Sequence, residues 1–139
     1  MVRPIIRSKL IFAKPAADAT VADAPIARDL LDTLAAHAHE CVGLAANMVG
    51  ASKRIIAFDG DGTPRVMFNP AIVATSGPYR AEESCLSLTG ARIAQRFDRI
   101  VVEYQLIEDG ELVAKRERFS GFTAQIIQHE VDHTNGICI

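Results

Sequence analysis

The residues best suited to chemistry form a short polar run close to the C-terminal end of the sequence. There, His129, Glu130 and His133 make up the pattern H-E-x-x-H. Residues four apart lie one above the other on a helix, so the two imidazoles can present nitrogens to one metal ion. Glu130 is rotated around the helix but stays close enough to act as a general base toward a water on that metal. The pattern favours a metal site over the alternative, a solvated polar face near a helix end.

A catalytic metal site needs a third protein ligand and an open position for water or substrate. Cys85 is the leading candidate, because it lies in the polar, loop-like segment 82–87, where a thiolate could point at an ion. The alternative is that Cys85 is a small buried hydrophobic residue, the usual situation of a free cysteine. His37 and His39 are two residues apart on an expected helix and face different sides of it. We expect these two to be exposed or to cap the helix end.

Two helices are predicted, and the second carries the H-E-x-x-H pattern. Residues 26–38 repeat apolar side chains at helical spacing after an Asp and a Pro that mark a helix start. Residues 123–133 form the second helix, which Asn135 and Gly136 bring to an end. The residues expected to be buried on this second helix are Phe122, Ile126, Ile127 and Val131.

Between the helices, β-branched and aromatic runs bounded by turn residues predict strands over 54–58, 66–68 and 71–75. A hairpin is predicted next, because residues 99–107 alternate apolar side chains onto one face and residues 111–119 return after a turn at 108–110. The order of helix, antiparallel strands and helix predicts an α+β fold. In this fold the strands pack around a central, metal-binding C-terminal helix.

Length and composition predict a single domain over residues 1–139, with 49% hydrophobic residues to form its core. The net charge is only −2 and the basic residues are scattered, so no direct nucleic-acid partner is expected. The apolar stretches are too short to span a membrane and no secretory signal is recognisable, so we expect no membrane partner and a cytoplasmic location. The three cysteines, Cys41, Cys85 and Cys138, indicate free thiols or a metal ligand rather than disulfides.

Three short motifs make the chain resemble the peptide deformylases, whose motifs are G-x-G-x-A-A-x-Q, E-G-C-L-S and H-E-x-D-H, in that order. Here residues 41–48 read C-V-G-L-A-A-N-M, residues 83–87 read E-S-C-L-S and residues 129–133 read H-E-V-D-H. The resemblance extends over nearly the whole sequence. It implies a peptide deformylase-like fold.

The resemblance implies a role for each residue of the site. Cys85, His129 and His133 would be the metal ligands, and Glu130 would be the base and acid. The backbone N–H of Leu86 would donate to the oxyanion. The implied cofactor is one divalent metal ion, Fe(II) in the cell, with zinc, nickel or cobalt able to replace it.

The resemblance also implies the reaction, which is removal of the formyl group from the N-terminal methionine of nascent polypeptides. A metal-activated water attacks the formyl carbon, with Glu130 as general base and then acid, and formate and a free amine are released. The expected partner is an N-formylmethionyl peptide or nascent chain. The residues implied to border it are Val42, Gly43, Leu44, Met48 and Ser87.

Charged residues around these motifs are candidates for supporting the ligands. Glu83 and Asp132 could hold an imidazole N–H or pair with an arginine such as Arg96. The alternative for both carboxylates is ordinary surface charge.

The chain departs from the family pattern most clearly at Met48, which replaces the glutamine whose amide donates to the oxyanion. A thioether donates nothing, and losing one such donor costs on the order of 100- to 1000-fold in rate. Asn47 could substitute, but in an extended segment its side chain would face the opposite side. Cys41 and Ser84 replace two motif glycines.

Three functions remain open on the sequence alone. The first is a metal-dependent deformylase. The second is a weak or inactive relative that binds metal and a peptide N-terminus, or acts on another formyl or acyl amide. The third is a zinc endopeptidase, which Cys85 disfavours because it would be an unusual third ligand there. The sequence ends soon after His133, so we expect neither the long C-terminal helix of one family branch nor ribosome docking through it.

Overall fold

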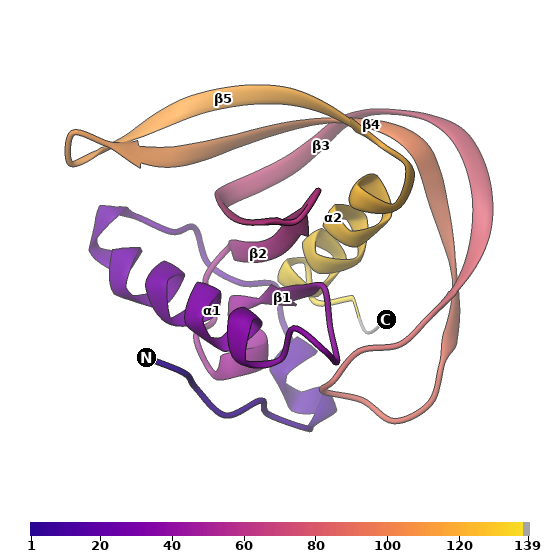
Figure 1. Ribbon diagram of the computed structural model, residues 1–139, viewed down its shortest axis with the longest axis horizontal. Helices are drawn as coiled ribbons and strands as arrows, with labels where there is room; N and C mark the ends of the chain where they lie inside the picture. Colours follow the sequence, from indigo (N-terminus) through magenta and orange to yellow (C-terminus); the bar gives the residue numbers. More distant parts are fainter. Residues whose placement is uncertain (138–139) are drawn as a thin grey trace.

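Helix α2 (Gly121–Thr134) lies inside the curve of a five-stranded antiparallel sheet, as Figure 1 shows for the computed structural model of the protein. The structure describes residues 1–137, so Cys138 lies outside the described residues. The predicted α+β arrangement, with antiparallel strands around a C-terminal helix, is confirmed.

The strands follow the order of the sequence across the sheet. They are β1 (Gly43–Ala45), β2 (Ile55–Gly60), β3 (Thr63–Glu83), β4 (Arg92–Glu108) and β5 (Glu111–Ser120). Every neighbouring pair is antiparallel, and β1 forms one edge of the sheet. β3 and β4 are long enough to curve around α2 in Figure 1, and this curvature brings the end of β3 close to the helix.

β3 is one long strand, so the prediction of two short strands over 66–68 and 71–75 is wrong. Asn69 and Pro70 resemble a turn in the sequence. In the structure, Asn69 has a positive φ of 52° where the pairing register with β4 shifts, so the chain forms a bulge and the strand continues. The Asn69 side chain donates to Gln105 Oε1 of β4 at 2.7 Å, which ties the bulge to the neighbouring strand.

The predicted hairpin between β4 and β5 is confirmed. Glu108 pairs with Glu111 across Asp109 and Gly110, whose φ angles are 51° and 78°. Positive φ at both central residues is typical of the two-residue turn that matches the twist of a hairpin. The first strand is longer than predicted, since β4 begins at Arg92.

α1 (Ala24–Ala36) begins and ends two residues before the predicted bounds of 26–38. His37 caps its C-terminal end and its Nδ1 lies 2.7 Å from Glu40 Oε2, while His39 is exposed. The expectation for these two histidines is confirmed. Short 3-10 helices lie at η1 (Lys9–Phe12), η2 (Val21–Asp23) and η3 (Ala46–Val49).

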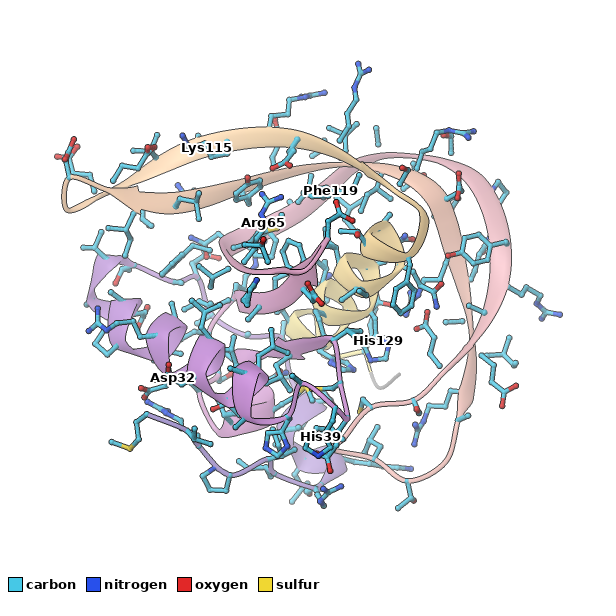
Figure 2. The ribbon with its side chains drawn as sticks, viewed as in Figure 1. Asp32, His39, Arg65, Lys115, Phe119 and His129 are labelled. Carbon is cyan, nitrogen blue, oxygen red and sulfur yellow. The ribbon has the colours of Figure 1, made fainter. Side chains whose placement is uncertain are left out.

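The hydrophobic core lies between the two α-helices and the sheet. Its fully buried members include Leu30 of α1, Leu44 of β1, Ile55, Ile56 and Phe58 of β2, and Ile127 of α2. Figure 2 shows His129 of α2 within the molecule, whereas Asp32 and His39 lie at the surface. Within residues 1–137, no helix is both long and apolar enough to span a membrane.

Candidate active site

Two elements bring the three predicted metal ligands together. His129 and His133 lie on one face of α2 with their ring centroids 4.4 Å apart, and Cys85 comes from the loop that follows β3. One ligand atom from each residue lies within 4.8 Å of the other two. His133 is fully buried and His129 is 7% exposed. A single ion could therefore contact all three side chains.

The loop that carries Cys85 is fixed through its backbone. Arg7 donates from Nη1 to the carbonyl oxygen of Leu86 at 2.6 Å. The backbone N–H of Ser87 donates to the Cys85 sulfur. These contacts fix the backbone that directly follows the cysteine.

The Cys85 thiol is held in its ionised form, which is the form that binds metals. Burial raises its pKa, but hydrogen bonds with His129 and His133 outweigh that effect and lower the pKa to about 6. Burial lowers the pKa of His129, yet hydrogen bonds with Cys85 and Glu83 raise it to about 9. A thiolate with two imidazoles suits zinc, iron, cobalt or nickel, so the residues present fit a divalent metal.

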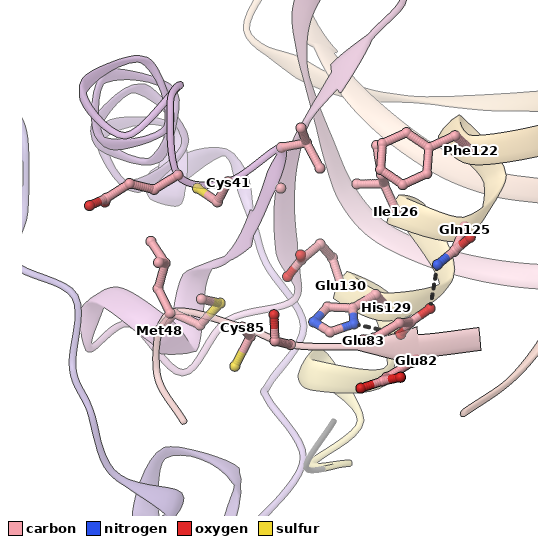
Figure 3. A pocket seen from close by; sticks show the side chains of 15 residues that line it. Cys41, Met48, Glu82, Glu83, Cys85, Phe122, Gln125, Ile126, His129 and Glu130 are labelled. Atoms are coloured by element: carbon pink, nitrogen blue, oxygen red, sulfur yellow. Dashed lines mark hydrogen bonds and ion pairs between the residues drawn. The ribbon is translucent and has the colours of Figure 1, made fainter. Parts of the chain in front are cut away.

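Glu83, the last residue of β3, fixes the orientation of His129. Its Oε1 accepts from His129 Nδ1 at 2.8 Å and from Arg96 Nη2 at 2.6 Å, and Figure 3 shows the contact with the imidazole. Arg96 also donates to Asp132 at 2.7 Å. The expected pairing is confirmed, and surface charge is the wrong description of Glu83, because Glu83 and Arg96 are both buried.

This network keeps Glu83 ionised. Burial raises the pKa of its carboxyl group, but hydrogen bonds from His129 and Arg96 lower the pKa to about 2. At neutral pH the Glu83 carboxylate therefore accepts a hydrogen bond from the Nδ1–H of His129. The Nε2 side of the ring is left for Cys85 or for a metal.

A cavity of about 280 Å³ opens beside Cys85 and His129, two of the three potential ligands, as Figure 3 shows. Val42, Gly43 and Met48, three of the residues expected to border the substrate, line it. Leu44 and Ser87 do not, since the Leu44 side chain is fully buried in the core and Ser87 is buried outside the cavity wall. The residues that α2 contributes to the wall are Phe122, Gln125, Ile126, His129 and Glu130.

β1 approaches α2 so closely that a glycine is needed at Gly43. A Cβ atom there would lie 2.8 Å from Ile126 Cγ2 and 2.9 Å from Glu130 Oε2. Within residues 1–137, the only sheet partner of β1 is β2, so its other edge is unpaired. This edge lies beside Glu130, where a peptide could add as a further strand.

Met48 faces the cavity from η3, not from a strand as expected for residues 41–48, of which only 43–45 are extended. Its sulfur accepts from the Ala45 N–H at 3.4 Å. Asn47 donates from Nδ2 to the His133 carbonyl at 2.8 Å. Asn47 is therefore directed at the end of α2 and does not replace the missing oxyanion donor.

The prediction that Phe122 is buried is wrong, since its side chain is 63% exposed at the cavity wall. Gln125 was overlooked, although it lines the same cavity. Phe122, Gln125 and His129 are separated by three and four residues, so helical spacing alone places them on one face. That spacing is the signal by which the sequence could have identified a cavity wall on α2. Other lining residues that were overlooked are Glu40, Cys41 and Glu82.

An α+β fold whose central helix presents H-E-x-x-H beside a cysteine defines a metallohydrolase. Comparison with known proteins identifies the family. Residues 4–139 match the family described as polypeptide deformylase. The chain belongs to the polypeptide deformylase family.

Individual relatives agree with this assignment along the whole chain. A peptide deformylase of Clostridium beijerinckii is 45% identical over 139 residues, which is 100% of both chains. The crystal structure of peptide deformylase from Thermotoga maritima matches with a TM-score of 0.84 and 29% identity, covering 99% of this chain and 94% of that one. A class I type b peptide deformylase from Acinetobacter baumannii with Met-Ala-Ser bound matches with a TM-score of 0.85 and 29% identity, over 99% and 96% of the two chains.

Proposed function

We propose that the protein is a metal-dependent deformylase that removes the formyl group from the N-terminal methionine of nascent polypeptides. The observation that carries this proposal is the cluster of Cys85, His129 and His133, two of which line a cavity that Glu130 also lines. Family membership supports the same reaction class. Because nascent chains are made in the cytoplasm, the proposed reaction would take place there.

Cys85, His129 and His133 would hold one divalent ion, Fe(II) in the cell or zinc, nickel or cobalt in purified protein. When bound, such an ion supplies Lewis acidity that lowers the pKa of a nearby water and polarises the formyl carbonyl.

Glu130 moves the proton in this scheme. Its Oε1 lies 3.1 Å from His133 Nδ1, and its other oxygen faces Gly43 of β1. From there it takes a proton from the attacking water as the new C–O bond forms, and it returns that proton to the nitrogen as the C–N bond breaks. The products are formate and a free amine, with no further reactant required.

Leu86 would stabilise the negative charge on the formyl oxygen through its backbone N–H. Arg7 supports this role because it fixes the carbonyl of the same residue. Met48, in the position of the second donor, supplies no N–H or O–H. The site therefore contains one of two donors, and slow turnover is expected.

The substrate would lie along the unpaired edge of β1. A peptide backbone can add to such an edge by main-chain hydrogen bonds, with alternate side chains entering pockets. Val42, Met48, Phe122 and Ile126 give the cavity an apolar surface that suits a methionine side chain. Among the solved structures, the bound Met-Ala-Ser of the Acinetobacter baumannii enzyme is a peptide of this kind.

The second candidate is a relative that binds metal and a peptide N-terminus with little turnover, or acts on another acyl amide. Met48 is the observation that favours it. The test is metal analysis of protein purified without oxygen, together with formate release from a formyl-Met peptide before chelation, after chelation and after metal is restored.

We expect about one divalent ion per chain and formate release that disappears and returns with the metal. The control is the same peptide with an acetyl group in place of the formyl group, and it should react far more slowly. A metal-loaded protein that releases no formate would support the binding role, and cleavage of peptide bonds in an unformylated substrate would support the endopeptidase.

A further inference from the structure

We propose that Gln125 and Tyr79 are positioning residues for the metal centre, acting on His129 through Glu83. This inference rests on the proposed metal site. It concerns a hydrogen-bonded chain that runs from Tyr79 of β3 to Gln125 of α2, then to Glu83 and the Nδ1 atom of His129. Figure 3 shows the contacts of Glu83 with Gln125 and His129.

The carboxylate of Glu83 is fully occupied by donors. Oε1 accepts from His129 Nδ1 at 2.8 Å and from Arg96 Nη2 at 2.6 Å. Oε2 accepts from Arg96 Nε and from Gln125 Nε2, both at 2.9 Å. A carboxylate has about four lone-pair positions, so each is in use. Gln125 supplies the one donor that belongs neither to the imidazole nor to Arg96.

The side-chain amide of Gln125 can donate to Glu83 only in one of its two orientations. Tyr79 sets that orientation, because its hydroxyl donates to Gln125 Oε1 at 2.9 Å. The amide NH₂ group must then face Glu83. The opposite orientation would place the amide oxygen against a carboxylate and leave the tyrosine hydroxyl without its acceptor.

The fold places the members of this chain in register. Tyr79 and Glu83 are four residues apart on β3, so they project from the same face of the strand. Tyr79 is paired directly with Arg96 of β4. Gln125 precedes His129 by four residues, one turn along the same face of α2. Three elements thus converge on one carboxylate.

Removing the Gln125 donor should loosen Glu83 and, through it, the ring of His129. Partners that orient a metal ligand typically change metal affinity 10- to 100-fold. Gln125 contacts Glu83 and not the ligand itself, so Gln125→Met should weaken metal binding by about 3- to 10-fold. Tyr79→Phe removes only the hydroxyl that orients the amide and should have a smaller effect, about 2- to 3-fold.

The test is a double-mutant cycle on the affinity for Zn²⁺ or Co²⁺, measured by competition with a chromophoric chelator. Because Tyr79 acts through Gln125, the double variant should bind metal no more weakly than Gln125→Met alone. The visible spectrum of the Co²⁺ protein should shift in both single variants. Tyr104→Phe is the matched control: its hydroxyl contacts Glu117 and Arg65, away from the cavity, and metal affinity should not change.

Additive losses, or wild-type affinity and an unchanged Co²⁺ spectrum in Tyr79→Phe, would overturn the proposal. If Gln125→Met does not fold, the test rests on Tyr79→Phe compared with Tyr104→Phe. Metal affinity and the Co²⁺ spectrum should change in Tyr79→Phe and stay unchanged in Tyr104→Phe. A wild-type protein that binds no metal would instead overturn the proposed function, and this inference with it.

Discussion

The two cysteines that line the cavity differ in chemical state. Hydrogen bonds with two histidines outweigh the effect of burial on Cys85 and lower its pKa to about 6. Burial and the charge of Glu130 raise the pKa of Cys41 to about 11, and the backbone hydrogen bond from Gly43 is too weak to offset them. Cys85 belongs to the half of the site built by α2 and the end of β3. Cys41 belongs to the half built by β1 and η3.

The two halves of the site also differ in how well they match the family's motifs and in how their side chains are supported. In the half around α2, Glu83, Arg96 and Asp132 support the potential ligands with short hydrogen bonds. In the half around β1, Met48 stands where the family has a donor, and Cys41 replaces a glycine. The half around α2 would hold the metal and the base Glu130, whereas the half around β1 holds no proposed ligand, so substitutions in the half around β1 should be able to change turnover without changing metal binding.

The largest effect is expected for Glu130→Gln. Gln keeps the size and hydrogen bonding of Glu130 but lacks its basicity, so formate release should fall by roughly 100- to 10,000-fold. Metal content should stay near that of the wild type, because no ligand is removed. Retained turnover, measured at saturating formyl-Met peptide, would mean that another base operates.

Cys85→Ala tests whether Cys85, and not Cys41, binds the metal. It leaves two protein ligands, so metal affinity should fall by on the order of 100-fold or more, as measured by chelator competition. Cys41→Ala is the matched control, since Cys41 lines the same cavity but keeps its proton. Full metal occupancy in Cys85→Ala, or equal losses in both variants, would contradict the assignment of Cys85 to the metal.

Gly43→Ala tests the contact between the two halves. The new Cβ would lie within 3.0 Å of Ile126 and Glu130, so either β1 or the Glu130 carboxylate must move. Such overpacking costs about 1 to 3 kcal/mol, and we expect kcat to fall while metal affinity stays unchanged. Gly110→Asn at the hairpin tip, where a side chain meets open space, should leave activity intact. A loss of metal in Gly43→Ala would show that the halves are not independent.

Much of the half around α2 could be predicted from the sequence. The H-E-x-x-H spacing fixes two ligands on one helical face whatever the tertiary structure, and the polar segment around Cys85 indicates a loop. For Glu83 and Asp132 the sequence left open whether they hold an imidazole, pair with Arg96 or are surface charge, because opposite charges in a sequence do not reveal which of them are buried together. In the structure both carboxylates pair with Arg96, and Glu83 also accepts from His129.

The half around β1 was harder to predict, since its conformation depends on packing. The apolar residues in 41–48 fit a strand, but the chain turns into η3 after Ala45, and this turn directs Asn47 at His133 and Met48 at the cavity. Asn69 and Pro70 indicated a turn, yet pairing with β4 continues past them as a bulge. In both places, contacts with segments distant in the sequence outweigh the secondary-structure preferences of the local residues.

Met48→Gln tests the central claim, that this chain keeps a complete metal-binding half and lacks one donor in the other half. The new carboxamide should donate to the oxyanion beside the Leu86 N–H, a charge that exists only in the transition state. We expect kcat for formate release to rise by about tenfold, with a ceiling of roughly 100- to 1000-fold, while metal affinity and KM change little. A variant that folds, keeps its metal and releases formate no faster would contradict the claim, and would favour another substrate or a binding role.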